Sequence, residues 1–372
     1  MEFGLSFRRL KPPTREVRPN GTGDVRQRIV IHAGFAKCGS ASIRTALLQN
    51  FRTLRKHKIF VFDKDLKIAR TGADLVGTPI WVLEEARKKS ENLTQRLSNE
   101  ISAVAGRKAD HLAILSAENL ANPGMVKLFP ELDRQFEVCV IFYLRPQLQW
   151  IPSAWKQWGL KTGVPLSDFV SRCVQAYRPS FRMAIDAWKN AFPAATVRVR
   201  FLISELLNGG NPVQDFFHLL RLPKDDYSFE NEPRNPSLDA SILHVLSKNP
   251  HLFSGVHDNS LTLALTRALS KKFRSKNIQM LSPEQQAKIE ECFRDENLRL
   301  LKTYCDGIDV DRIYRAYFMP QEAEARYSSM GDIDLIYRCL GIILESIASN
   351  DDQIRAGETK IPGPNPLEAK EE

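Results

Sequence analysis

Residues 28–50 read RIVIHAGFAKCGSASIRTALLQN, and this stretch decides the fold. Its apolar run at 29–31 is typical of a short strand that is buried on both faces. From Ser40 onward, apolar residues recur at a helical spacing, so we expect a helix to begin there. Residues 34–40 form a tight turn with two glycines between the strand and the helix. The alternative is an ordinary strand-to-helix turn. However, glycines, a lysine and hydroxyl residues coincide here, and backbone N–H groups at a helix start favour phosphate or sulfate.

Further apolar runs are separated by helical segments along the chain. We expect strands over 28–33, 59–62, 111–115, 138–144 and 196–201. We expect helices over 40–50, 81–105, 166–176, 181–192, 283–304 and 333–347, with helix or short turns over 147–158. Thr78 with Pro79 and the capping-box pair Ser282 and Gln285 are expected to start two of the helices. This alternation predicts an α/β fold in which helices flank a mostly parallel central sheet and ligands bind beyond the carboxyl ends of the strands.

The chain ends differ in composition from the rest. Residues 1–27 are basic and carry prolines and glycines, so we expect a disordered tail, with a membrane-touching arm as the alternative. Residues 28–320 are expected to form the α/β domain, and 321–350 a helical extension. The charged, proline-containing segment 351–372 is expected to be a second disordered tail.

Composition narrows the class of protein. The chain has 372 residues, 43% of them hydrophobic, with a net charge of +9 and a pI near 9.2. The positive charge suits an anionic ligand, but Lys and Arg are spread along the chain, which does not support nucleic-acid binding. Apolar runs fall short of the ~20 residues that cross a bilayer, and the N-terminus lacks a signal-peptide core. The six cysteines lack CxxC spacing, so we expect free thiols in a cytoplasmic protein.

Two phosphate chemistries compete for the turn at 34–40. A Walker A loop needs G-x-x-x-x-G-K followed by Ser or Thr, but Ser40 stands where the lysine belongs, which disfavours an NTPase. Cys38 and Arg44 match the C-x5-R spacing of cysteine-dependent phosphatases, in which a thiolate attacks phosphorus. Gly39 directly follows the cysteine instead of coming three positions later, and we expect Arg44 to point along the helix. The phosphatase therefore remains an alternative.

The turn also resembles a known family. Lys37-Cys38-Gly39-Ser40 is similar to the 5′-phosphosulfate loop of sulfotransferases that use 3′-phosphoadenosine 5′-phosphosulfate (PAPS), whose common form is P-K-S/T-G-S/T-S/T. Ala36 and Ala41 depart from this form, at the proline and at the second hydroxyl. Arg145, which ends a predicted strand, and Ser153 eight residues later resemble the 3′-phosphate site of the family. The resemblance is to the bacterial and carbohydrate-directed branch, and it implies a P-loop-like three-layer fold.

The resemblance implies a role for each matched residue. Lys37 is expected to stabilise negative charge on the bridging oxygen as the sulfonate leaves. Cys38, Gly39, Ser40, Ala41 and Ser42 form the loop and the helix start that would hold the 5′-phosphate, through backbone amides and the two serine hydroxyls. Arg145 and Ser153 would bind the 3′-phosphate. Simpler roles stay open, with Lys37 as a solvated cation and Arg145 as a partner of a carboxylate.

A general base must take the proton of the acceptor hydroxyl. In the cytosolic branch of the family a histidine stands at the end of the corresponding strand; here the strand over 111–115 is closed by a segment that ends in Glu118, so the resemblance makes Glu118 the candidate. Glu118 is as well suited to capping the next turn, and His32 and His57 are the reserves. Asn235 and Ser237 weakly resemble a nucleotide-covering segment of the family, and a helix N-cap is the preferred interpretation of Asn235.

The function that this resemblance implies is sulfonate transfer from PAPS to a hydroxyl of an unidentified acceptor, a carbohydrate or other small molecule, with no metal required. The non-enzymatic alternative is a catalytically degenerate protein that binds nucleotide and serves as an interaction protein. Lys37 and Arg145 are both present, which argues against this alternative. The sequence does not reveal the acceptor or the oligomeric state.

Overall fold

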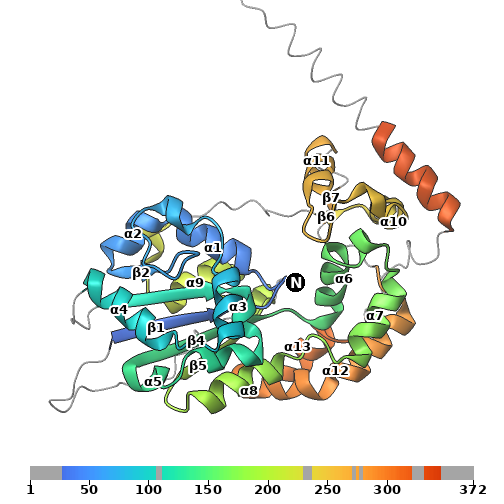
Figure 1. Ribbon diagram of the computed structural model, residues 1–372. Helices are drawn as coiled ribbons and strands as arrows, with labels where there is room; N and C mark the ends of the chain where they lie inside the picture. The colour runs from blue at the N-terminus through green and yellow to red at the C-terminus, as the bar shows by residue number, and fades with distance from the viewer. Residues whose placement is uncertain are drawn as a thin grey trace, which may run out of the picture. The chain divides into compact units, whose positions relative to one another are not determined.

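The computed structural model describes residues 27–105, 111–228, 237–269, 274–275, 280–320 and 331–344 (Figure 1). Its central feature is a five-stranded sheet in the order β2-β3-β1-β4-β5, in which every pair of neighbours is parallel. The strands are β1 (Gln27–Ala33), β2 (Ile59–Val61), β3 (Leu112–Ala117), β4 (Phe136–Leu144) and β5 (Thr196–Phe201). The predicted α/β fold with a parallel central sheet and flanking helices is therefore confirmed.

The burial of the strands follows their sequence patterns. The last five residues of β1 and of β3 are buried, as expected for apolar runs at the centre of a parallel sheet. The edge strand β5 alternates instead: Val199 and Phe201 are buried, whereas Arg198 is exposed. This alternation gives β5 an apolar face and a basic face.

Contacts within the chain divide it into two compact units. The first contains the sheet and comprises Met1–Trp150, Tyr177–Asn231 and Glu290–Met319; the second comprises Ile151–Ala176, Glu232–Ile289 and Pro320–Glu372. Helices of the first unit are α1 (Ser40–Gln49), α2 (Phe51–Lys56), α3 (Ile80–Lys89), α4 (Thr94–Ala105), α5 (Leu132–Gln135), α8 (Phe181–Ala191), α9 (Pro212–Leu219) and α13 (Val310–Tyr317). The predicted extent of one α/β domain, 28–320, stays a prediction.

The predicted helix over 81–105 is wrong in one respect, because it is two helices. α3 begins at Ile80 with Pro79 rather than Thr78 at its N-cap, and it ends at Lys89, followed by the C-cap Ser90 in a left-handed conformation. The N–H of Leu93 then donates to the Leu128 carbonyl oxygen at 2.7 Å, and the Leu93 side chain is fully buried. This tertiary anchor interrupts a segment whose alternation of apolar and charged residues suits one continuous helix.

The second unit is mainly helical. It contains α7 (Leu166–Gln175), α10 (Ala240–Ser247), α11 (Ser260–Ala268), a helix over 332–344 and the short antiparallel pair β6 (Ser237–Leu238) and β7 (Arg274–Ser275). Two helices cross the division of the chain, α6 (Gln147–Gln157) and α12 (Pro283–Tyr304). The predicted capping box is confirmed, since Ser282 and Gln285 exchange hydrogen bonds of 2.9 and 3.3 Å.

Some expectations fall on residues that the structure does not describe. Most of the 1–27 tail, Asn235 and the whole of 351–372 lie outside the described residues, and the expected helix over 333–347 is confirmed for its part up to 344. The N-cap of α10 is Asp239, whose carboxylate accepts the Ser241 N–H. Among the helices that are described, we find none with the length and apolar composition that a membrane span requires.

Candidate functional site

The candidate site lies where three neighbouring strands end. β1 is central, and its partners β3 and β4 lie on opposite sides of it, so the connections of the chain diverge at this point of the sheet. Open parallel sheets bind ligands at such a divergence, beyond the carboxyl ends of the strands. β1 is followed by the 34–39 turn, β3 by Glu118 and β4 by Arg145. The topology therefore brings the predicted residues from three distant parts of the sequence to one edge.

The turn after β1 has the backbone geometry that the glycine predicted. Gly39 is the N-cap of α1 at φ 84° and ψ 1°, in the left-handed region, and Lys37 also has a positive φ of 63°. Gly39 supplies no capping side chain, so the N–H groups of Ser40, Ala41 and Ser42 in the first turn have no side-chain cap from this position. N–H groups at a helix start, together with the helix dipole, form an anion-binding arrangement.

Gly34 lets the ends of β1, α1 and β3 approach closely. A Cβ atom at this position would lie 3.2 Å from Ser40 Cβ and 3.3 Å from Glu118 Cα, tighter than ordinary contact. Ser40 Oγ donates a hydrogen bond of 2.5 Å to Glu118 Oε1. A residue predicted to hold phosphate and the predicted base are thus direct neighbours. The Glu118 carboxylate, at the end of β3, therefore accepts a hydrogen bond from the first residue of α1.

Two cations lie beside this pair. Burial lowers the pKa of Lys37, the charge of Arg145 lowers it further, and the Glu118 carboxylate opposes the shift. Burial also lowers the pKa of Arg145. Both side chains are half-buried, so water screens their charges less than it would on an open surface. The edge therefore offers an anion two cations and a set of N–H groups, with one carboxylate among them.

Cys38 is a poor nucleophile in this setting. The side chain is 1% exposed, and burial raises the pKa of its thiol to about 12, although the Arg145 charge and backbone N–H lower it. Arg44 donates to the carbonyl oxygens of Gly77 and Ser116, the latter at 3.2 Å. A phosphatase of the C-x5-R type needs a thiolate held by its arginine, so neither observation favours that alternative.

The turn is held from the β4 side by residues to which the sequence assigned no role. Trp150 Nε1 donates to the Ala36 carbonyl oxygen at 2.8 Å, directly before Lys37. The Phe35 ring packs edge-on against Phe181, with the ring centroids 4.8 Å apart. The sequence shows a tryptophan five residues after Arg145, but it does not show the hydrogen-bond partner of this tryptophan, a backbone oxygen more than a hundred residues away.

The reserve bases lie in other surroundings. His32 is fully buried within β1, where its Nδ1 lies 2.8 Å from Ser116 Oγ, and burial lowers its pKa to about 4. His57 precedes β2, at the amino end of that strand, and pairs with Asp226 at 2.5 Å. Glu118 is half-buried directly after β3, whereas His32, although next to last in β1, is fully buried. Ser153 is half-buried on α6, in the second unit, and its role stays a prediction.

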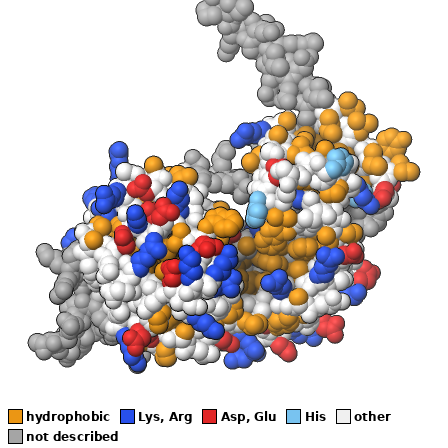
Figure 2. Space-filling model, in the orientation of Figure 1, with side chains coloured by type: hydrophobic (Ala, Val, Ile, Leu, Met, Phe, Trp, Pro, Cys, Tyr) orange, Lys and Arg blue, Asp and Glu red, His pale blue; other side chains and the backbone are white. Residues whose placement is uncertain are grey.

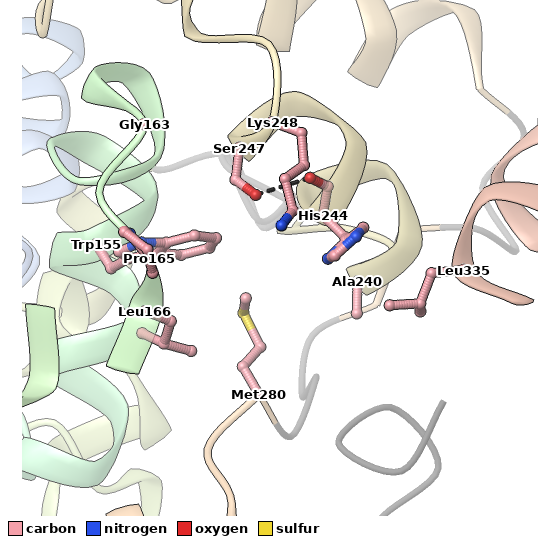
Figure 3. A pocket seen from close by; sticks show the side chains of 10 residues that line it. All are labelled: Trp155, Gly163, Pro165, Leu166, Ala240, His244, Ser247, Lys248, Met280 and Leu335. Carbon is pink, nitrogen blue, oxygen red and sulfur yellow. Dashed lines mark hydrogen bonds between the residues drawn. The ribbon is translucent and has the colours of Figure 1, made fainter. Parts of the chain in front are cut away.

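The second unit contains a separate cavity of about 350 Å³ (Figure 3). Trp155, Leu166 and Met280 supply apolar walls, and His244 and Lys248 of the α10 region face them. The two basic side chains already lie 3.3 and 3.8 Å from the carboxylate of Asp332. This lining offers more contacts to an apolar compound than to a multiply charged one.

Comparisons with known proteins add little. No family model matches the chain, and no solved structure matches it. A protein of Archaeoglobus fulgidus, described as an uncharacterized protein, is 26% identical over 166 residues. The match covers 44% of this chain and 45% of that protein, so the chain spans less than half of the length of this relative.

Within the described ranges, no group of three or more His, Cys, Asp and Glu side chains could hold a metal ion.

Proposed function

We propose that this protein is a sulfotransferase that uses PAPS and transfers its sulfonate group to a hydroxyl of an acceptor, a carbohydrate or other small molecule. One observation carries the proposal: Lys37 and Arg145, two half-buried cations from different strand ends, flank a helix start whose N-cap is a left-handed glycine. This combination suits a ligand with two separate anionic groups, and PAPS carries a 5′-phosphosulfate and a 3′-phosphate.

The proposed roles divide between binding and chemistry. The N–H groups of residues 40–42 would hold the 5′-phosphate, and Arg145 would bind the 3′-phosphate, with Ser153 as the predicted second contact. The acceptor oxygen attacks sulfur, and the bond from sulfur to the bridging oxygen breaks. Lys37 would then neutralise the negative charge that this oxygen gains. Glu118 would take the proton of the acceptor hydroxyl, so the transfer requires no covalent enzyme intermediate.

Calorimetric titration tests the proposal through the second anionic group. Adenosine 3′,5′-bisphosphate and adenosine 5′-phosphate differ by the 3′-phosphate alone. A charge-assisted arginine contact contributes about 1.5–3 kcal/mol, so Arg145→Ala should weaken the bisphosphate by roughly tenfold or more and leave the monophosphate almost unchanged. The matched control is Arg52→Ala, which removes the same charge from an exposed position on α2.

Each outcome of the titration is decisive for the role of Arg145. Equal losses for the two nucleotides would show that Arg145 does not recognise the 3′-phosphate. Absence of bisphosphate binding to the unmodified protein would reject the PAPS site. Tight bisphosphate binding without transfer to any hydroxylated sugar, lipid or phenol would favour the degenerate nucleotide-binding protein.

A further inference from the structure

The helix over 332–344 in the second unit is apolar on two faces. One face carries Leu335, Cys339 and Ile342, which are at most 7% exposed; Cys339 and Ile342 belong to the core of the unit. The same helix is fixed by Arg338, whose guanidinium lies 3.0 Å from the Asp239 carboxylate. Its position against α10 therefore has both apolar and ionic support.

The other face is a stripe of large apolar side chains that this structure leaves open to solvent. Their exposed fractions range from 39 to 70%, and Figure 2 shows hydrophobic side chains gathered over this helix, which is drawn in red-orange in Figure 1. We call these residues the outer stripe: Ile333, Ile336, Tyr337, Leu340, Ile343 and Leu344. Single exposed apolar residues are ordinary, but a contiguous set on one helix marks an interaction surface.

The spacing of the outer stripe suits a helix as its partner. Residues 333, 336, 340 and 343 are separated by three, four and three positions, which is the a/d spacing of a coiled-coil seam. An a/d seam accepts another helix with the same spacing, because each side chain inserts between four residues of the facing helix. In the part of the chain that the structure describes, the other large exposed apolar residues do not form such a stripe.

We propose that the outer stripe pairs with the same helix of a second copy of this chain, so that the protein forms a two-fold dimer. A two-fold interface is self-complementary, and the one described surface that matches the seam is the seam itself. With ~150 Å² for a fully exposed large side chain, the six side chains expose about 500 Å², so complete pairing would remove at most that area from each copy. The total of at most about 1,000 Å² stands at the threshold for a biological interface and below the range of tightly held ones.

The charges beside the outer stripe argue against a lipid surface as its partner. Helices that lie on membranes carry Lys and Arg along the polar face, which attracts anionic headgroups. Here the helix begins with Asp332 and Asp334, and its arginine, Arg338, is paired with Asp239. An acidic start with a paired arginine leaves no basic face along 332–344 for anionic lipid.

Sedimentation velocity on the full chain tests the dimer. The unmodified protein should shift from monomer to dimer as its concentration rises from about 1 to 100 µM, where a micromolar dissociation constant places the transition. Leu340→Asp should remain monomeric at the highest concentration, since it places a charge in the seam. Leu263→Asp is the matched control, because Leu263 lies on α11 and is 46% exposed, close to the 49% of Leu340. The control should dimerise like the unmodified protein.

Circular dichroism of both variants establishes that they are folded, and Ile336→Asp provides a second substitution in the stripe. A monomeric unmodified protein at the highest concentration would overturn the proposal, and so would a dimer of Leu340→Asp. Flotation of a monomeric protein with vesicles of phosphatidylcholine and phosphatidylserine, lost in Leu340→Asp, would instead assign the stripe to a lipid surface. None of these results depends on nucleotide binding.

Discussion

Gly39→Ala isolates the energetic cost of the backbone conformation at the candidate site. Gly39 lies at φ 84°, where an L-residue with a Cβ is disfavoured by about 1–2 kcal/mol. Substitution by alanine also stiffens the unfolded chain, which returns about 0.4–1 kcal/mol. Steric overlap adds nothing, since the new Cβ would lie 3.4 Å from the nearest atom, Pro212 Cγ, an ordinary contact. The net expectation is a loss of ~1 kcal/mol in the free energy of unfolding.

Gly72→Ala is the control in the same unit. Its Cβ would lie 3.6 Å from the nearest atom, the Leu48 carbonyl oxygen, and Gly72 does not have a left-handed φ. This variant should keep only the entropic gain, so urea unfolding followed by circular dichroism should separate the two variants by about 1–2 kcal/mol. Equal unfolding midpoints would mean that the turn does not hold Gly39 in the left-handed region, and the anion-binding geometry at α1 would lose its basis.

Three further expectations concern single side chains in or near the candidate site. The Lys37→Met and Glu118→Gln variants should bind adenosine 3′,5′-bisphosphate with an affinity within a few-fold of that of the unmodified protein. Each should lower the rate of sulfonate transfer by ~10² or more. A near-normal rate in either variant would show that the substituted residue takes no part in the chemistry. Cys38, with a thiol pKa of about 12, should resist iodoacetamide at pH 8, where its thiolate fraction is ~10⁻⁴, and Cys38→Ser should retain nucleotide binding; rapid labelling mapped to Cys38 by mass spectrometry would contradict its burial. His32 has a folded-state pKa of about 4, below its unfolded value, so the unfolded state takes up the proton first and stability falls as the pH drops from 6.5 to 4, by up to about 3 kcal/mol; an unchanged pH profile of stability in His32→Gln would refute this.

The parallel sheet and the turn at its centre were predictable because their signals are local. Uninterrupted apolar runs predict β1, β3 and β4 as buried strands, and most residues of these strands are buried in the structure. Gly39 was identifiable as a special backbone position, since glycine before a helix start supplies conformations that other residues avoid. Glu118 and Arg145 could be placed at the same edge as Lys37 because parallel strands present their carboxyl ends together.

The features that escaped prediction depend on long-range contacts. The break between α3 and α4 comes from the Leu93 hydrogen bond to Leu128, which no local pattern encodes. Trp150 was visible as one of a group of tryptophans, but its bond to the Ala36 oxygen follows from the packing of α6 beside the turn. The hydrogen bond between Ser40 and Glu118 likewise requires the register of β1 and β3, in which Ala33 lies opposite Ala117.

That hydrogen bond gives the free protein an internal competitor for the proposed anion site. The hydroxyl of Ser40 is engaged by the carboxylate of Glu118, so an arriving anion must displace that carboxylate or share the hydroxyl with it. Two negative charges at this separation repel each other, and a small anion has only one set of contacts to offset the repulsion. A ligand that also binds Arg145 has a second set of contacts to offset the repulsion. Rejection of inorganic phosphate and sulfate, both abundant in cells, would then follow from a carboxylate that the chain itself supplies.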